Sequence, residues 1–126
     1  MSPIQAFNPP DSKSSAPLSR AVRAGDFIFI GGMGIDFEDS QEAAEQAFRS
    51  LFEKLKKLFD DIGITYKDIV KVTAYLSDSH RFHKTWNKVY GEFFSEPYPA
   101  RATLPIIQEG GKTLGCEVEM VAYVGK

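Results

Sequence analysis

The 126 residues are enough for one domain, because a chain of this size buries roughly two-thirds of its unfolded surface on folding. Hydrophobic residues make up 43% and charged residues 25% of the chain, which is ordinary globular usage and excludes a disordered or fibrous protein. The net charge of -2 argues against a protein built to neutralise nucleic-acid phosphates. The single cysteine cannot form an internal disulfide, and the N-terminus has no apolar run, so we expect a cytoplasmic protein that binds no membrane.

The first 17 residues contain four prolines, which lack the backbone donor and block the preceding helical turn. This predicts an irregular arm over 1–17, followed by a single domain over 18–126.

A hairpin is predicted next, because two short runs flank Gly25, which supplies the positive φ of a tight connection. The second run, 27–30, is continuously apolar, as expected of a strand covered on both faces. Gly31 and Gly32 follow it and permit a bulge or the close approach of a ligand.

Two amphipathic helices are predicted from apolar residues recurring at three- and four-residue steps. The first begins at a capping box in which Asp39 is the cap and Glu42 reaches back to it, and Gly63 ends it. The second covers about 79–94. The first stripe is Ala44, Ala47, Phe48, Leu51, Phe52, Leu55, Leu58 and Phe59, and the second is Phe82, Trp86, Val89, Tyr90 and Phe93.

Three further strands are predicted at 68–76, 100–107 and 114–124 from alternating apolar residues. In the first of them, Val70 shares a face with Val72, Ala74 and Leu76. Pro105 lacks a ladder donor, so the second should lie at a sheet edge or carry a bulge at that point. In the last strand, Glu117 and Glu119 share the face opposite the core, and Gly110-Gly111 before it reads as a turn.

The predicted order is hairpin, helix, strand, helix, strand, strand, which makes an α+β domain with a mixed sheet and two helices packed on one face. The other sheet face is too apolar to leave in water, so we expect self-association to cover it.

Arg101 projects from a strand among small and apolar residues and needs an anion there. The sequence leaves two partners open. One is a substrate carboxylate, and the other is a cross-strand pair with Glu117 or Glu119.

The motif Pro99-Ala100-Arg101-Ala102-Thr103-Leu104, followed by Glu117-Val118-Glu119-Met120-Val121-Ala122, resembles the signature of the RidA (YjgF) family. The opening 20–26, the strand at 68–76 and Asn87 through Phe94 match as well, so that the resemblance covers about 16–124.

This resemblance implies a chorismate-mutase-like homotrimer with clefts between subunits, acting on small 2-imino or enamino acids without a metal or organic cofactor. It implies that Arg101 binds the substrate carboxylate and that Glu117 positions or activates the hydrolytic water. The other substrate-binding positions that it implies are Leu18, Gly31, Gly32, Asn87, Phe94 and Thr103.

The chain departs from the family at three of these positions: Leu18 replaces a tyrosine, Gly31 replaces a serine and Thr103 replaces a cysteine. Tyr98 or Thr103 is a candidate for the substitute hydroxyl. The missing hydroxyls keep open a non-catalytic module that binds keto acids.

Two other kinds of function are weaker. Ribonuclease action, attached to some relatives, lacks a histidine acid/base pair in the motif. His80 and His83 near Asp78 have metal-ligand spacing, but no third ligand is evident, and exposed histidines are common.

Overall fold

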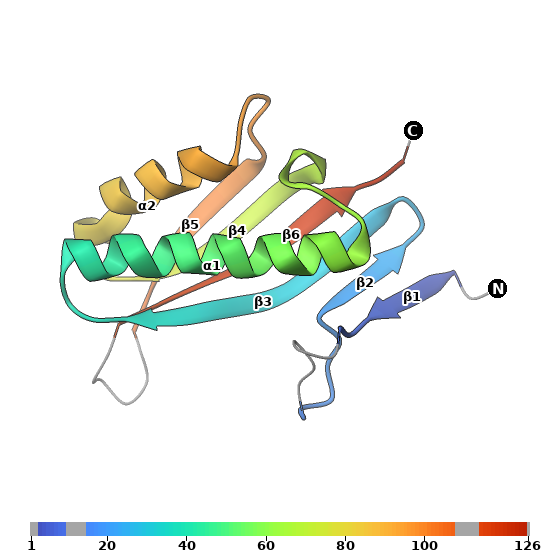
Figure 1. The fold of residues 1–126 in the computed structure, drawn as a ribbon, viewed down its shortest axis with the longest axis horizontal. Helices are drawn as coiled ribbons and strands as arrows, with labels where there is room; N and C mark the ends of the chain where they lie inside the picture. Colours follow the sequence, from blue (N-terminus) through green and yellow to red (C-terminus); the bar gives the residue numbers. More distant parts are fainter. Residues whose placement is uncertain (1–2, 10–14, 108–113, 126) are drawn as a thin grey trace.

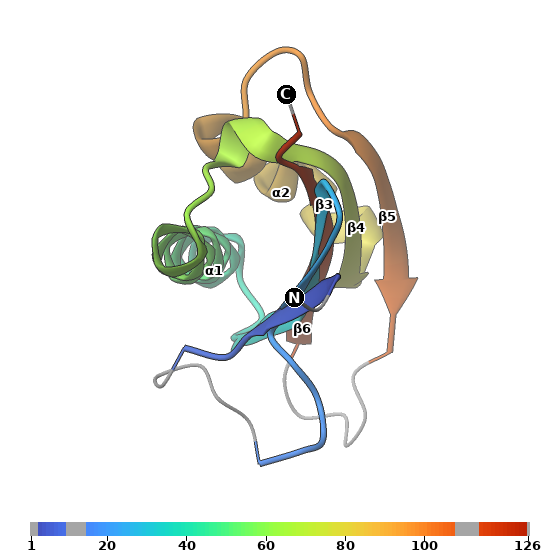
Figure 2. The same cartoon turned by 90° about the vertical axis from the view of Figure 1, so that its right-hand side faces the viewer.

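The computed structural model describes residues 3–9, 15–107 and 114–125. Within these residues, six strands form one sheet in the order β1-β2-β3-β6-β4-β5, and two α-helices lie on one of its faces (Figures 1 and 2). β4 and β5 are parallel and the other neighbours are antiparallel, so the predicted α+β class with a mixed sheet is confirmed. The elements are β1 (Ile4–Phe7), β2 (Ala21–Ala24), β3 (Phe27–Phe37), α1 (Gln41–Ile62), the 3-10 helix η2 (Tyr66–Asp68), β4 (Ile69–Ser77), α2 (Ser79–Phe93), β5 (Ala100–Ile106) and β6 (Leu114–Tyr123).

The ends of α1 are set by one polar side chain and one glycine. The N-cap is Ser40, whose hydroxyl accepts a hydrogen bond from the Ala43 amide at 3.0 Å, so the prediction of Asp39 as the cap is wrong. The Asp39 carboxylate instead accepts a hydrogen bond from the Arg81 guanidinium of α2. Gly63 ends the helix as predicted, with a φ of 84° that a residue bearing a Cβ rarely adopts.

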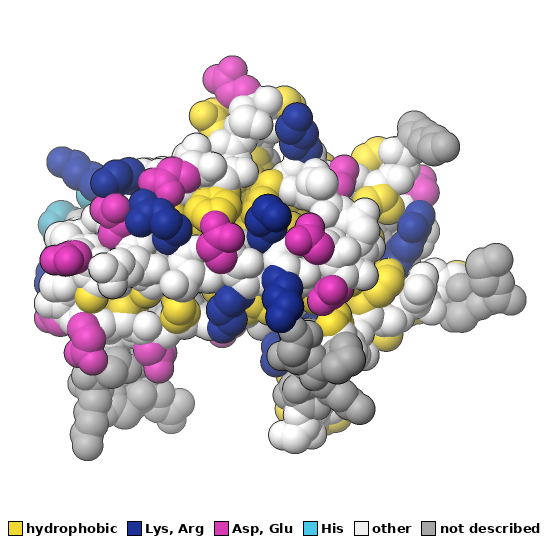
Figure 3. Space-filling model, in the orientation of Figure 1, with side chains coloured by type: hydrophobic (Ala, Val, Ile, Leu, Met, Phe, Trp, Pro, Cys, Tyr) yellow, Lys and Arg dark blue, Asp and Glu magenta, His cyan; other side chains and the backbone are white. Residues whose placement is uncertain are grey.

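The core lies between the two helices and the sheet. Phe48 and Phe52 of α1 each pack against Trp86 of α2, with ring centroids 5.2 Å apart. Both predicted stripes are buried except Ala47 and Phe93, which are half-buried. In Figure 3 the apolar surface between the helices is flanked by charged side chains of both signs.

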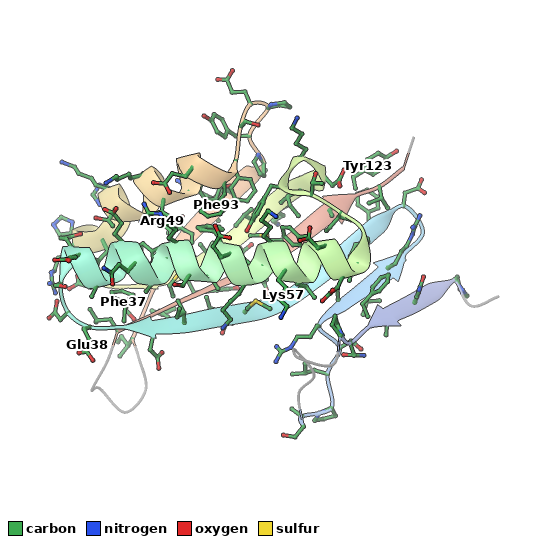
Figure 4. The ribbon with its side chains drawn as sticks, in the orientation of Figure 1. Phe37, Glu38, Arg49, Lys57, Phe93 and Tyr123 are labelled. Carbon is green, nitrogen blue, oxygen red and sulfur yellow. The ribbon has the colours of Figure 1, made fainter. Side chains whose placement is uncertain are left out.

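Charged side chains join the two helices above this apolar seam. Arg49 of α1 donates to Glu92 of α2 at 2.7 and 2.8 Å, and Lys88 of α2 donates to Glu45 of α1 at 3.0 Å. Figure 4 shows Arg49 beside Phe93, over the line where the helices meet. Such exposed ion pairs contribute little to stability individually.

The faces of β4 and β6 follow the predicted alternation with one exception. Cys116, Val118, Met120 and Ala122 of β6 are buried under the helices, whereas Glu117 and Glu119 are exposed. In β4, however, Val70 is 43% exposed and Ile69 is buried instead, because the pairing with β6 shifts register between Ile69 and Lys71. The prediction that Val70 shares the core face is therefore wrong.

The sequence predicted one of the two edge strands of the sheet but not the other. β5 forms one edge, which is one of the two alternatives that Pro105 left open. β1 forms the other edge by pairing with β2, so the expectation of an irregular arm is wrong for Ile4–Phe7. The prolines exclude a helix there but leave an edge strand possible. The turn predicted at Gly110-Gly111 lies outside the described residues.

The sheet face opposite the helices is uncovered by the described residues (Figure 2). Phe27 and Phe29 of β3 are 42% and 49% exposed, and Tyr123 of β6 lies edge-on to Phe27 with ring centroids 5.3 Å apart. We call this surface the open face. Its burial by further copies of the chain remains a prediction.

Candidate active site

Arg101 lies on the helix side of the edge strand β5. It pairs in register with Val72 of β4, a residue buried under the helices, and paired residues on neighbouring strands share a face. One guanidinium nitrogen, Nη2, donates to Oδ1 of Asn87 on α2 at 2.8 Å. The guanidinium carbon also lies 4.6 Å from the ring centroid of Tyr90, on the same helix.

No carboxylate forms an ion pair with Arg101 in the part of the chain that the structure describes. Its side chain is exposed, and its contacts are Asn87 and Tyr90 rather than a glutamate. The alternative of a cross-strand pair with Glu117 or Glu119 is not found, because both glutamates project from the opposite side of the sheet. The remaining guanidinium N–H groups are therefore available to an incoming anion.

Thr103 follows Arg101 on the same face of β5. Its hydroxyl oxygen is buried and has no hydrogen-bond partner among the described residues. A buried hydroxyl without a partner is costly, and a ligand that reached it would remove that cost. Tyr98, the other candidate for a substitute hydroxyl, is 58% exposed in the segment before β5.

Phe94 does not line this surface in the single chain. Its ring is only 4% exposed and stacks on Tyr90 with centroids 4.2 Å apart and an interplanar angle of 20°. The structure therefore places Phe94 in the layer behind Tyr90. We call the surface formed by Asn87, Arg101 and Thr103 the arginine half-site.

Glu117 lies on the open face, above a glycine-rich stretch of β3. The pairing of β3 with β6 is interrupted between Ile30 and Met33, so a bulge, one of the two alternatives that Gly31 and Gly32 left open, is present. A methyl group on Gly32 would lie 2.6 Å from Oε2 of Glu117, so only glycine leaves the carboxylate room where it is. The Gly31 amide donates to the Arg20 carbonyl at 2.8 Å, and Leu18, in the preceding segment, is 50% exposed.

The two glutamates of β6 differ in their surroundings. The Tyr75 hydroxyl donates to Oε1 of Glu119 at 3.1 Å, and this bond raises the pKa of Tyr75. Glu117 forms no hydrogen bond or ion pair through its side chain within the described residues. Glu117 is therefore the one of these two glutamates whose carboxylate has no hydrogen-bond partner among the described residues. We call Gly31, Gly32 and Glu117 the glutamate half-site.

Cavities open beside the glutamate half-site. One of about 430 Å³ is bordered by Glu117, Gly34, Ile106 and Lys54. Another, of about 420 Å³, is bordered by Gly31, Ser19, Lys71 and Glu119 on the open face. No pattern in the sequence singles out Lys54, because its place in the lining of this cavity depends on how α1 packs on the sheet.

The two half-sites face opposite sides of one sheet. Arg101 sits under α2, Glu117 sits on the open face, and β4 separates their strands. One chain therefore brings together Arg101 with Asn87 and Thr103, and Glu117 with Gly32, but it does not bring Arg101 to Glu117. A side chain on Gly31 would instead meet the Ser19 and Arg20 carbonyls, whereas Gly34, which the sequence did not single out, pairs with Glu117.

The histidines contribute to neither half-site. Nδ1 of His83 lies 3.0 Å from the His80 carbonyl oxygen in the first turns of α2. Among the residues that the structure describes, no group of three or more His, Cys, Asp or Glu side chains could hold a metal ion. No helix in these residues is long and apolar enough to cross a membrane.

Comparison with known proteins gives consistent matches along the chain. A family model described as Endoribonuclease L-PSP matches residues 9–124. A RutC family protein of Pyrococcus abyssi is 36% identical over 116 residues, which is 88% of this chain and 89% of the relative. The 2-iminobutanoate/2-iminopropanoate deaminase of Homo sapiens is 32% identical over 119 residues, 86% of this chain and 81% of the relative.

Solved structures share the fold over nearly the whole chain. RidA from an Antarctic Psychrobacter species has a TM-score of 0.72 and 25% identity, covering 98% of this chain and 100% of the other. A yjgF family member from Streptococcus pyogenes has a TM-score of 0.76 and 21% identity, with both chains fully covered. The sequence signature, the sheet with its paired helices and these matches show that the chain belongs to the RidA (YjgF) family.

Proposed function

We propose that this protein hydrolyses small 2-imino acids, of the 2-aminoacrylate or 2-iminopropanoate kind, to a 2-keto acid and ammonia. The observation that carries the proposal is Arg101, an exposed guanidinium held by an amide and an aromatic ring, with no carboxylate as its partner among the described residues. The names of the human and bovine relatives, 2-iminobutanoate/2-iminopropanoate deaminase, support the substrate class.

Arg101 binds the substrate carboxylate in this proposal. A planar guanidinium holds a carboxylate by two parallel hydrogen bonds, which fixes the position of the adjacent imine carbon. The Thr103 hydroxyl, buried and without a described partner, then donates to the substrate or accepts from it. The arginine half-site thus supplies binding and orientation.

Glu117 supplies the proton transfers. Its carboxylate takes a proton from water as the water oxygen attacks the imine carbon, which gives a carbinolamine. The same carboxyl group returns this proton to the nitrogen, which completes the neutral carbinolamine. The carboxylate then accepts the hydroxyl proton and passes it to the amine, and the C–N bond breaks as the C=O double bond forms and ammonia leaves. One imino acid and one water thus give one keto acid and one ammonia, without a redox step.

Two copies of the chain complete the site. Because Arg101 and Glu117 face opposite sides of their own sheet, the arginine half-site of one copy must meet the glutamate half-site of another. Burial of the apolar open face drives that association, and a homotrimer with three such clefts closes it symmetrically.

The test of the activity generates 2-iminopropanoate in situ from alanine with an amino-acid oxidase and follows its loss. We expect Arg101→Ala and Glu117→Gln to lose acceleration, whereas Lys56→Ala, on the outer side of α1, keeps it. Unchanged hydrolysis by Arg101→Ala would contradict the proposal.

The shared site has its own test, in which Arg101→Ala and Glu117→Gln chains are unfolded together and refolded as mixed oligomers. About one quarter of the interfaces then contain both intact half-sites if copies mix at random, so activity should return to about that fraction of wild type. No recovery in oligomers shown to be mixed would exclude a site shared between copies.

A keto-acid binding module is the second candidate, favoured by the absence of hydroxyls at Leu18 and Gly31. Thermal stabilisation by pyruvate without any turnover would select it. Ribonuclease action, as in the description of the family model, has less support, since His80 and His83 belong to neither half-site. An assay with labelled RNA tests this activity separately: RNA cleavage that persists in Glu117→Gln would show that it does not depend on the proposed deaminase site.

A further inference from the structure

The structure points to Tyr90 as a positioning residue for Arg101. We propose that the face of its ring holds the guanidinium plane, so that the edge not bound by Asn87 is presented to a carboxylate. This inference rests on the proposed role of Arg101 in substrate binding. Tyr90 has the helical spacing of a core residue, and nothing in the sequence separates it from the rest of its stripe.

The geometry gives Arg101 two fixed contacts. Asn87 holds one nitrogen at 2.8 Å, and the Tyr90 ring centroid lies 4.6 Å from the guanidinium carbon. One hydrogen bond alone leaves a planar group free to rotate about that bond. A contact with the face of the group removes this freedom, and a group that is already oriented loses less entropy when the ligand binds.

The Tyr90 ring is itself immobilised. It is 6% exposed, and Phe94 stacks on it at 4.2 Å and 20°. Phe94 in turn lies 4.9 Å from the ring of Tyr66. Because one ring face cannot hold two groups, the guanidinium occupies the face opposite Phe94. The order Phe94, Tyr90, Arg101 is thus a stack that begins in the core and ends at the half-site.

The ring rather than the hydroxyl carries the effect. The hydroxyl oxygen of Tyr90 is buried and has no hydrogen-bond partner among the described residues. Burial raises the pKa of Tyr90, although the charge of Arg101 opposes this, so the phenol stays neutral near pH 7. What attracts the cation is therefore the negative face of the aromatic ring, which phenylalanine also has.

The test compares Tyr90→Phe and Tyr90→Leu with Phe93→Leu as a matched control. Phe93 lies on the same helix, and its ring packs against Phe52 and Tyr66 rather than against Arg101. Binding is measured by calorimetry with two probes, pyruvate and its uncharged amide. Thermal unfolding of each variant records the loss of packing separately.

We expect Tyr90→Phe to bind pyruvate within about 2-fold of wild type, and Tyr90→Leu to bind it about 3- to 30-fold more weakly. Binding of the amide should change little, since it lacks the charge that Arg101 recognises. Phe93→Leu should lose thermal stability but keep its affinity for pyruvate. Wild-type affinity in Tyr90→Leu, or an equal loss in Phe93→Leu, would overturn the inference.

Two further measurements keep the outcomes distinct. If Arg101→Ala binds pyruvate as tightly as wild type does, the proposed function fails. If Arg101→Ala weakens pyruvate binding but Tyr90→Leu does not, the inference about Tyr90 fails and the proposed function stands. Should Tyr90→Leu not fold, the side-chain N–H signals of Arg101 in wild type, assigned with Arg101→Lys, answer the question. A ring-current shift of those signals is expected, and its absence refutes the stack.

Discussion

Replacing Gly32 by alanine moves the Glu117 carboxylate without disturbing the fold. The new methyl group would lie 2.6 Å from Oε2 and 3.0 Å from the carboxylate carbon, whereas ordinary van der Waals contact begins at 3.4 Å. The oxygen must therefore move by about 0.8 Å. The atoms that give way belong to the end of a flexible side chain, so the backbone keeps its course.

This displacement of the carboxylate should lower the catalytic rate. A general base acts within a narrow range of hydrogen-bond distances, and an error of about 1 Å in its position lowers the rate on the order of 10²-fold. We therefore expect kcat for imine hydrolysis to fall about 10- to 100-fold. KM should stay within about 3-fold, because the carboxylate contact that we propose is Arg101 of another copy, and the atoms that the new methyl group displaces belong to Glu117.

The free energy of unfolding of Gly32→Ala should increase slightly or stay unchanged. Alanine reduces the conformational freedom of the unfolded chain, which stabilises a tolerant site by about 0.4–1 kcal/mol. Gly91→Ala is the matched control, since nothing lies within 4 Å of the added methyl on the exposed side of α2. It should raise the melting temperature and leave kcat unchanged.

A double-mutant cycle separates this mechanism from a general disturbance. In the Glu117→Gln background the base is already absent, so adding Gly32→Ala should lower the rate no further. A further 10-fold loss there, or wild-type kcat in Gly32→Ala alone, would refute the reasoning. A crystal structure of the single variant should show the Glu117 carboxylate displaced.

Three more predictions concern stability and reactivity. Ser40→Ala removes the cap that accepts from the Ala43 amide and should lower the free energy of unfolding by about 1 kcal/mol in urea titrations, whereas Ser40→Asp should retain it. Hydrogen bonds from Lys88 and Arg49 lower the pKa of Glu45, and the two from Arg49 to Glu92 lower the pKa of Glu92. The stability that these ion pairs contribute is complete above the ordinary carboxyl pKa of 4.5 and is lost as pH falls through the lowered pKa values. Arg49→Met should therefore flatten the acid side of a plot of melting temperature against pH. An unchanged plot would contradict this. Burial raises the pKa of Cys116 far above the physiological range, so a maleimide at pH 8 should label the unfolded chain and leave the native one unmodified over the same time.

Much of the local structure could be predicted because its signals are local. The alternation in β6 separates Cys116 and Val118 from Glu117 and Glu119 without reference to any other strand. Gly63 marks the end of α1 because a positive φ is a property of one residue. Pro105 restricts β5 to an edge or a bulge because it lacks one donor, and the structure places it at the edge. The residues of the RidA motif are likewise read directly from the chain.

Other features depended on residues far away in sequence. Asp39 has the right chemistry for a cap, yet Arg81, 42 positions later, takes its carboxylate and leaves the cap to Ser40. Val70 continues the alternation of β4 on paper, but the register shift against β6 turns it outward. In both cases two local solutions were available, and a contact from another element chose between them.

The candidate site divides in the same way. From the sequence came Arg101, Glu117 and the glycines after the hairpin as groups with suitable chemistry. Only the tertiary structure decided that Arg101 lies under α2 against Tyr90, that Gly32 makes room for Glu117, and that the two charged groups occupy opposite faces. The reason is that alternation with period two fixes which residues of one strand share a face, whereas the pairing of strands and the placement of the helices fix which face that is.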